Sequence, residues 1–78
     1  MHYVYMIQCK DGTYYTGWTT DVEARVKAHT QGTGAKYTKG RGPVTLVHVE
    51  TFAEKSDALK REGAIKKMTR SQKLQLIK

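Results

Sequence analysis

The sequence predicts one small α+β domain whose elements follow in the order ββαβαα. Short segments rich in β-branched and aromatic residues are separated by turn residues, and other segments begin with helix-capping patterns. The 78 residues suffice for a single domain, residues 1–78, and a chain of this size buries only roughly 60% of its unfolded surface. A large substrate therefore has to bind on an open face.

The first two predicted strands form a hairpin. Residues 2–9 are β-rich, and residues 13–16 resume that pattern. The Asp-Gly dipeptide between them is a strong hairpin signal, because both residues tolerate positive φ. The two strands should pair antiparallel and bring Tyr5 and Tyr15 onto one small sheet. A third strand is predicted over residues 44–51.

The first helix is predicted over residues 21–31. Thr20 and Glu23 form a capping box ahead of it, with the threonine as N-cap, and Gly32 closes it. Residues 32–43 contain four glycines and the only proline, so this segment is predicted to be a loop.

The second and third helices carry their own start signals. Ser56 is expected to cap a helix that runs to about residue 68, and Thr69 and Gln72 repeat the capping box before a short terminal helix. The apolar stripe of the second helix is predicted to consist of Ala58, Leu59, Ile65 and Met68.

Polar residues occupy positions beside or inside the predicted apolar faces. Val22 and Val26 should face the sheet, and helical periodicity places Arg25 and His29 at the border of the same face. Glu62 falls within the stripe of the second helix, where a carboxylate is costly unless it is paired or binds a cation.

Each polar residue also has an ordinary structural interpretation. Arg25 could pair with an acidic residue of its own helix, and His29 could be a partly buried, hydrogen-bonded histidine. Glu62 could pair with Lys66, four residues further on. Taken singly, these interpretations are the more common ones.

Together with the tyrosine pair, however, the same residues suit phosphodiester hydrolysis. A carboxylate can hold a divalent cation, a guanidinium can grip a phosphate at two points, and a histidine or an activated tyrosine can accept a proton from water.

Positive charge is clustered along the chain. Lys and Arg number 14 against 7 Asp and Glu, which gives a net charge of +7. Such clustering suits a polyanion, and we expect nucleic acid as the partner, although small basic proteins can be basic merely for solubility. The expected contact residues are Lys36, Lys39, Arg41, Lys66, Lys67, Arg70 and Lys73.

The sequence also excludes some classes of protein. A single cysteine, Cys9, rules out an internal disulfide and cysteine-rich metal clusters, and it fits a reducing cytosol. No apolar run approaches the roughly 18 residues of a membrane span, and the N-terminus lacks a signal-peptide pattern. A cytoplasmic protein without membrane association is therefore expected.

The spacing of these residues resembles the GIY-YIG nuclease superfamily. Tyr3-Val4-Tyr5 and, ten residues on, Tyr15-Thr16-Gly17 are similar to its paired tripeptides, and Arg25 and His29 match its helix arginine and the His or Tyr one turn later. Glu62 matches its metal ligand. The segments 34–38 and 65–67 further resemble small single-domain bacterial members, which are close to the nuclease module of structure-specific endonucleases.

The resemblance implies a three-stranded antiparallel sheet flanked by helices. It implies one Mg²⁺ or Mn²⁺ ion held mainly by Glu62, water activated by Tyr5 or Tyr15, transition-state stabilisation by Arg25, and an orienting or relaying role for His29. Trp18 lies where some members carry a lysine that could activate a tyrosine.

Three functions follow as hypotheses. The first is an endonuclease that cleaves DNA, favoured over RNA, in repair or recombination. The second is a nucleic-acid-binding module without catalysis, or a nuclease that needs a partner protein for targeting or activity. The third is a small basic RNA-associated protein. Glu62 favours the first hypothesis, because a pure binder gains nothing from a carboxylate that faces phosphate.

Overall fold

The computed structural model describes residues 1–30 and 44–77. Its elements are β1 (His2–Gln8), β2 (Tyr14–Thr19), α1 (Val22–Thr30), β3 (Thr45–Phe52), α2 (Lys55–Lys66) and α3 (Arg70–Ile77). The order ββαβαα and the α+β class agree with the sequence prediction. The end of the first predicted helix lies outside the described residues, as does the predicted loop 32–43 with the helix-closing Gly32.

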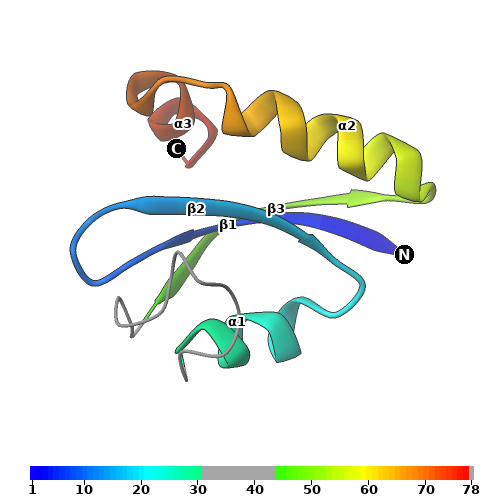
Figure 1. Ribbon diagram of the computed structural model, residues 1–78, viewed down its shortest axis with the longest axis horizontal. Helices are drawn as coiled ribbons and strands as arrows, with labels where there is room; N and C mark the ends of the chain where they lie inside the picture. The colour runs from blue at the N-terminus through cyan, green and yellow to red at the C-terminus, as the bar shows by residue number, and fades with distance from the viewer. Residues whose placement is uncertain (31–43, 78) are drawn as a thin grey trace.

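The three strands form one antiparallel sheet in the order β2-β1-β3, with β1 in the centre (Figure 1). On one side Tyr5 pairs with Gly17, and Ile7 pairs with Tyr15. Helix α1 lies over one face of this sheet, whereas α2 and α3 lie over the other. Strand β2 is therefore an edge strand that lies between two helical layers.

The β1–β2 hairpin forms at the predicted Asp-Gly pair. Gly12 has a φ of 87°, and positive φ occurs at no non-glycine residue within ranges 1–30 and 44–77. The Asp11 carboxylate accepts hydrogen bonds from the Thr13 amide and hydroxyl, at 3.1 and 2.6 Å. Strand β2 continues to Thr19, three residues past the prediction, because its pairing with β1 continues through Gly17 to Thr19.

The apolar core lies between the sheet and α2. Val4 and Met6 of β1 are fully buried there with Ala58 and Ile65 of α2. Leu59, predicted to belong to this stripe, is 44% exposed, because one residue beyond Ala58 turns the side chain by about 100° away from the sheet. Partly buried side chains extend the core: Tyr14, Trp18, Val47, Phe52, Met68, Leu76 and Ile77.

Two of the three predicted helix starts are wrong in detail. The cap of α1 is Asp21, whose carboxylate accepts the Ala24 amide at 3.1 Å, rather than Thr20. The Asp21 side chain stands immediately before the first helical residue, so it reaches the third amide of the helix. Helix α2 begins after Glu54 without a side-chain cap, so Ser56 lies inside its first turn.

The capping box of α3 is confirmed. The Thr69 hydroxyl accepts the Gln72 amide at 3.2 Å, and the Gln72 side chain accepts the Thr69 amide at 2.9 Å. In the described part of the chain, no helix is long and apolar enough to cross a membrane.

Candidate active site

A buried hydrogen bond joins the first tyrosine of the pair to the first helix. Tyr5 Oη lies 2.8 Å from His29 Nε2, and these residues are 2% and 1% exposed. The central strand supplies Tyr5, and the last turn of α1 supplies His29. The sequence predicted that Val22 and Val26 would pack on the sheet, but both are half-buried and His29 is the buried residue of α1.

Burial fixes the protonation states of this pair. Burial, and then the neighbouring Tyr15, raises the pKa of Tyr5 far above its ordinary value, so the phenol stays protonated. Burial, and then the positive charge of Arg25, lowers the pKa of His29. The imidazole is therefore neutral near pH 7, and the Tyr5 hydroxyl can donate to Nε2 in the tautomer that carries the ring proton on Nδ1.

Tyr15 completes a cluster of three rings, here called the ring cluster (Tyr5, Tyr15 and His29). Its ring centroid lies 5.1 Å from that of His29 and 6.5 Å from that of Tyr5. Tyr15 belongs to the edge strand and is half-buried, so it is the more accessible tyrosine. The expected approach of Tyr5 and Tyr15 on one sheet is thus present.

Gly17 makes room for the ring cluster. A Cβ atom at this position would meet the Tyr5 hydroxyl and would lie 2.6 Å from Tyr5 Cζ, closer than real Cβ contacts. The Tyr5 ring therefore crosses the backbone of the edge strand directly at Gly17. Gly17 is the last residue of the tripeptide Tyr15-Thr16-Gly17. The pairing of Tyr5 with Gly17 explains why a side chain does not fit at this position.

Two charged residues approach the ring cluster from opposite helical layers. Arg25 on α1 is exposed, and its charge acts on both Tyr5 and His29. Glu62 on α2 is half-buried, and its charge acts on Tyr5. The helices that carry Arg25 and Glu62 lie on opposite faces of the sheet, because α2 covers the face opposite to α1. Glu62 belongs to the helical layer on the other side of the sheet from His29.

Lys66 connects Glu62 to the second tyrosine. Its Nζ atom lies 3.6 Å from a Glu62 carboxylate oxygen and 5.9 Å from the Tyr15 ring centroid. The ordinary interpretation of Glu62, an ion pair four residues apart on one helix, is thus confirmed. Such half-exposed pairs are weak, so a divalent cation can compete for the carboxylate. Lys66 thus also brings a cation to the Tyr15 ring.

The neighbouring Arg61 holds α2 on the sheet. Its Nε and Nη2 atoms donate to the two Glu50 carboxylate oxygens of β3 at 2.8 and 3.0 Å. His48 Nε2 lies 2.8 Å from the same carboxylate, and the bond from Arg61 is the main reason why the pKa of Glu50 is lowered. This two-point contact lies one residue before Glu62 and fixes the helix that carries it.

The donor set around Glu62 suits a hydrated hard cation. Across residues 1–30 and 44–77, no group of three or more His, Cys, Asp or Glu side chains gathers into a protein cage for a metal. Mg²⁺ needs no such cage, because it retains several waters and commonly binds through one or two carboxylates and substrate phosphate. Glu62 therefore fits a site in which protein and substrate share the ion.

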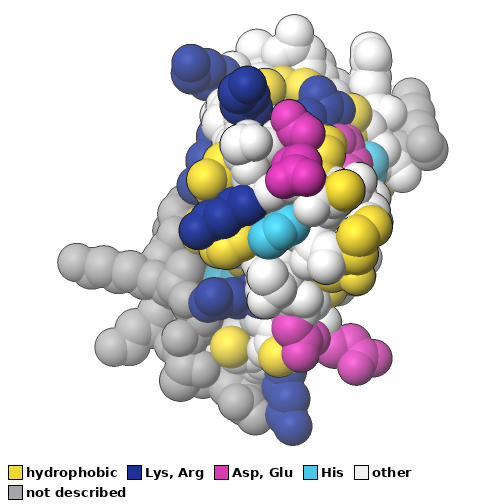
Figure 2. All heavy atoms as spheres, turned by 90° about the vertical axis from the view of Figure 1, so that its right-hand side faces the viewer, with side chains coloured by type: hydrophobic (Ala, Val, Ile, Leu, Met, Phe, Trp, Pro, Cys, Tyr) yellow, Lys and Arg dark blue, Asp and Glu magenta, His cyan; other side chains and the backbone are white. Residues whose placement is uncertain are grey.

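Four of the seven basic residues expected to contact nucleic acid lie in the described part of the chain. Lys66 borders the ring cluster, Lys67 is exposed after α2, and Arg70 and Lys73 lie on α3. Figure 2 shows acidic side chains among basic ones on the end of the molecule at the right of Figure 1, so the described residues there form no uniform basic patch. The other expected contacts, Lys36, Lys39 and Arg41, lie outside the described residues.

Comparison with known protein families and solved structures agrees with the fold described above. Residues 1–75 match the GIY-YIG catalytic domain, and the chain belongs to this family. It is 61% identical to a UPF0213 protein of Clostridium perfringens, over 99% of this chain and 83% of that protein. It is 62% identical to a UPF0213 protein of Halobacterium salinarum, over 94% and 95% of the two chains.

A solved structure supports the same assignment. The solution NMR structure of a UPF0213 protein from Bacillus halodurans is 51% identical, with a TM-score of 0.64, and the match covers 97% of this chain and 81% of that one. The chain is thus similar throughout to small GIY-YIG domain proteins.

Proposed function

We propose that this chain is a divalent-metal-dependent endonuclease that hydrolyses phosphodiester bonds of DNA, in repair or recombination. The buried Tyr5–His29 hydrogen bond carries this proposal, since Arg25 and Glu62 act electrostatically on the same phenol. The membership of the GIY-YIG catalytic domain family supports a nuclease-type activity.

The Tyr5–His29 pair provides a route for the proton of the attacking water. Tyr5 alone is a poor base, because burial keeps its phenol protonated. As a water molecule gives a proton to Tyr5 Oη, the phenol passes its own proton to the neutral His29 Nε2, 2.8 Å away. The resulting hydroxide attacks phosphorus, and the ester oxygen leaves. Tyr5 is thus the proposed water contact, and His29 the proton acceptor.

Arg25 and Glu62 are proposed to offset the negative charge of the substrate phosphate. Arg25, at the α1 border of the site, binds a non-bridging phosphate oxygen with its planar guanidinium. Glu62, with waters and substrate oxygens, would hold Mg²⁺ or Mn²⁺. The ion would neutralise charge on the scissile phosphate and its leaving oxygen. Tyr15 and Lys66 line the accessible side, where the substrate strand enters along β2.

Binding without catalysis explains this site less well. A nucleic-acid binder needs exposed cations and stacking surfaces, whereas Tyr5 and His29 are 2% and 1% exposed. Burying a phenol and an imidazole together has a desolvation cost that a binding surface has no reason to incur. A proton-transfer pair does require shielding from competing solvent.

Replacement of Glu62 tests the proposal. Glu62→Gln keeps the shape of the side chain but removes the charge, so Mg²⁺-dependent cleavage of branched or single-stranded DNA should fall by about 10³-fold. DNA binding should be unchanged or tighter, because a negative charge near phosphate is lost. Cleavage is measured on labelled oligonucleotides, and binding by fluorescence anisotropy.

The matched control is Glu54→Gln, which removes one carboxylate from the N-cap of the same helix, where it makes no capping bond. This variant should cleave like the wild type. If the wild-type chain cleaves neither DNA nor RNA with Mg²⁺ or Mn²⁺, the chain is not a nuclease on its own.

A further inference from the structure

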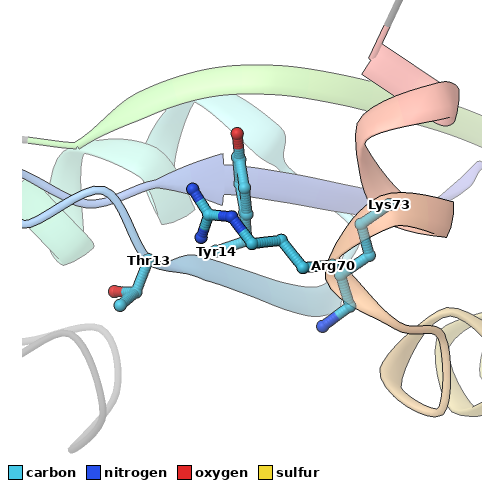
Figure 3. Close-up of a pocket in the computed structure, with 4 residues that line it drawn as sticks. All are labelled: Thr13, Tyr14, Arg70 and Lys73. Atoms are coloured by element: carbon cyan, nitrogen blue, oxygen red, sulfur yellow. The ribbon is translucent and has the colours of Figure 1, made fainter.

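We propose that a pocket beside the hairpin is a second phosphate-binding site, which holds the substrate strand next to the scissile bond. The hairpin pocket is about 200 Å³ in volume and is lined by Thr13, Tyr14, Arg70 and Lys73 (Figure 3). The inference rests on the proposed nuclease function and adds a position for the substrate strand.

The guanidinium in the hairpin pocket is held in place before any ligand arrives. Arg70 reaches from α3 over the Tyr14 ring, with its Cζ atom 5.1 Å from the ring centroid, as Figure 3 shows. Its Nη1 atom also donates to the Gly12 carbonyl at 3.3 Å. Stacking together with a hydrogen bond reduces the entropy that an exposed arginine loses when it binds phosphate.

A second cation and the local acid set the charge of the pocket. Lys73 lies three residues after Arg70 and hence on the same side of α3. Asp11 is the acidic group nearby in the turn, and its carboxylate already accepts two bonds from Thr13. Two cations against one engaged carboxylate favour an anion.

The ring in the pocket is not free to stack on a base. Tyr14 is partly buried against the core, and Arg70 covers its ring. Recognition of a single strand by stacking needs an open aromatic face. The hairpin pocket therefore suits a backbone phosphate, which carries no sequence information, rather than a nucleobase.

The hairpin pocket adjoins the ring cluster through the backbone. Tyr14 and Tyr15 are consecutive residues of edge strand β2, so their Cα atoms are about 3.8 Å apart and their side chains point to opposite faces. Along α2 and α3, Lys66 stands beside Tyr15, and Arg70 follows beside Tyr14. A strand that crosses the β2 edge can place its scissile phosphate at the ring cluster and a neighbouring phosphate in the pocket.

Salt-dependent binding of single-stranded DNA tests this position. The wild-type chain is titrated against labelled oligothymidylate by fluorescence anisotropy at several salt concentrations, with EDTA present to prevent cleavage. Each phosphate contact contributes about 0.7 to the slope of log affinity against log salt. Arg70→Gln and Lys73→Gln should each lower the slope, by at most this amount because both cations contact the same phosphate, and weaken binding several-fold.

Lys60→Gln is the charge-matched control. Lys60 is exposed on α2, about 200° around the helix from the buried Ala58, so the slope should stay at the wild-type value. Arg70 also joins α3 to the hairpin, so thermal unfolding is followed for its variant. Lys73→Gln provides the test that does not disturb the Tyr14 stack.

A direct readout separates this site from the nuclease function. NMR titration with short oligothymidylate should shift the Thr13 and Tyr14 amide signals, and Lys73→Gln should reduce these shifts. Unchanged slopes and unshifted signals would overturn the hairpin pocket even if the chain cleaves DNA. Reduced slopes with shifted signals would support it even if the wild-type chain cleaves nothing.

Discussion

The two faces of the sheet differ in what they bury, although the same strand supplies both. On the α2 face, β1 contributes Val4 and Met6 to an apolar core with Ala58 and Ile65. On the α1 face, the same strand contributes Tyr5, whose main buried partner is a histidine. Val4 and Met6 thus pack in the core, whereas Tyr5 and the fully buried Ile7 alternate with them along the strand, so the core and the proposed chemistry can be tested by separate mutations.

The energetics of the two faces differ accordingly. Apolar contacts stabilise the α2 face through the area removed from water. On the α1 face, burial of polar groups is tolerated because Tyr5 and His29 satisfy each other. Burial on this face has a second consequence, because it raises the pKa of Tyr5 and lowers the pKa of His29, so both groups are neutral near pH 7.

The largest effects are expected from two separate substitutions, one on each face of the sheet. Tyr5→Phe removes the hydroxyl of the proposed proton route, so kcat should fall by about 10²–10⁴-fold. The His29 ring nitrogen loses its partner, which should lower the free energy of unfolding by about 1–3 kcal/mol. Cleavage assays and urea unfolding measure the two effects.

The reciprocal change is Ile65→Ala in the core. Leaving a cavity should lower the free energy of unfolding by about 2–5 kcal/mol, whereas kcat below the unfolding temperature should stay near the wild-type value. If Ile65→Ala abolished cleavage in the folded protein, or Tyr5→Phe did not affect it, the division between the faces would be wrong.

A pair of glycines provides a test of intermediate size. At Gly17 an added methyl group would collide with Tyr5, so Gly17→Ala should lower the free energy of unfolding by about 1–3 kcal/mol and impair cleavage. At Gly63 in α2 nothing lies within 4 Å of the added methyl group. Gly63→Ala should therefore stabilise the protein by about 0.5–1 kcal/mol, without loss of cleavage. Equal effects at both positions would contradict the steric role of Gly17.

The mildest test changes only the pH. Burial lowers the pKa of His29 in the folded protein, so the unfolded chain binds this proton more tightly. The contribution of His29 is therefore fully present above its unfolded pKa of about 6.5 and is lost as the pH falls towards its lowered folded pKa. The free energy of unfolding, from urea titrations, should decrease from pH 7.5 to pH 5.

The matched variant for this measurement is His29→Phe, which should remove most of that pH dependence. Glu50 has a lowered pKa, so its own contribution is lost only at more acidic pH, below about 4.5. An unchanged pH dependence in His29→Phe would show that another group controls stability in this range.

Local patterns were sufficient to predict much of the fold. The Asp-Gly hairpin and the Thr69–Gln72 capping box depend on residues a few positions apart, and both are present. The caps of α1 and α2 were mispredicted because neighbouring residues compete for the same role, as Asp21 does with Thr20. Helical periodicity also misplaced Leu59, because it does not specify how wide a face of the helix packs on the sheet.

The sequence by itself determined the element order, the hairpin and the candidate residues, because these follow from short-range pattern and spacing. Only the tertiary structure decided how those residues meet. It placed Tyr5 against His29, across 24 positions of chain, and put Glu62 in the opposite helical layer, from which its charge still acts on Tyr5. The physical reason is that the burial and pairing of polar groups depend on strand register and helix packing, which no local pattern specifies.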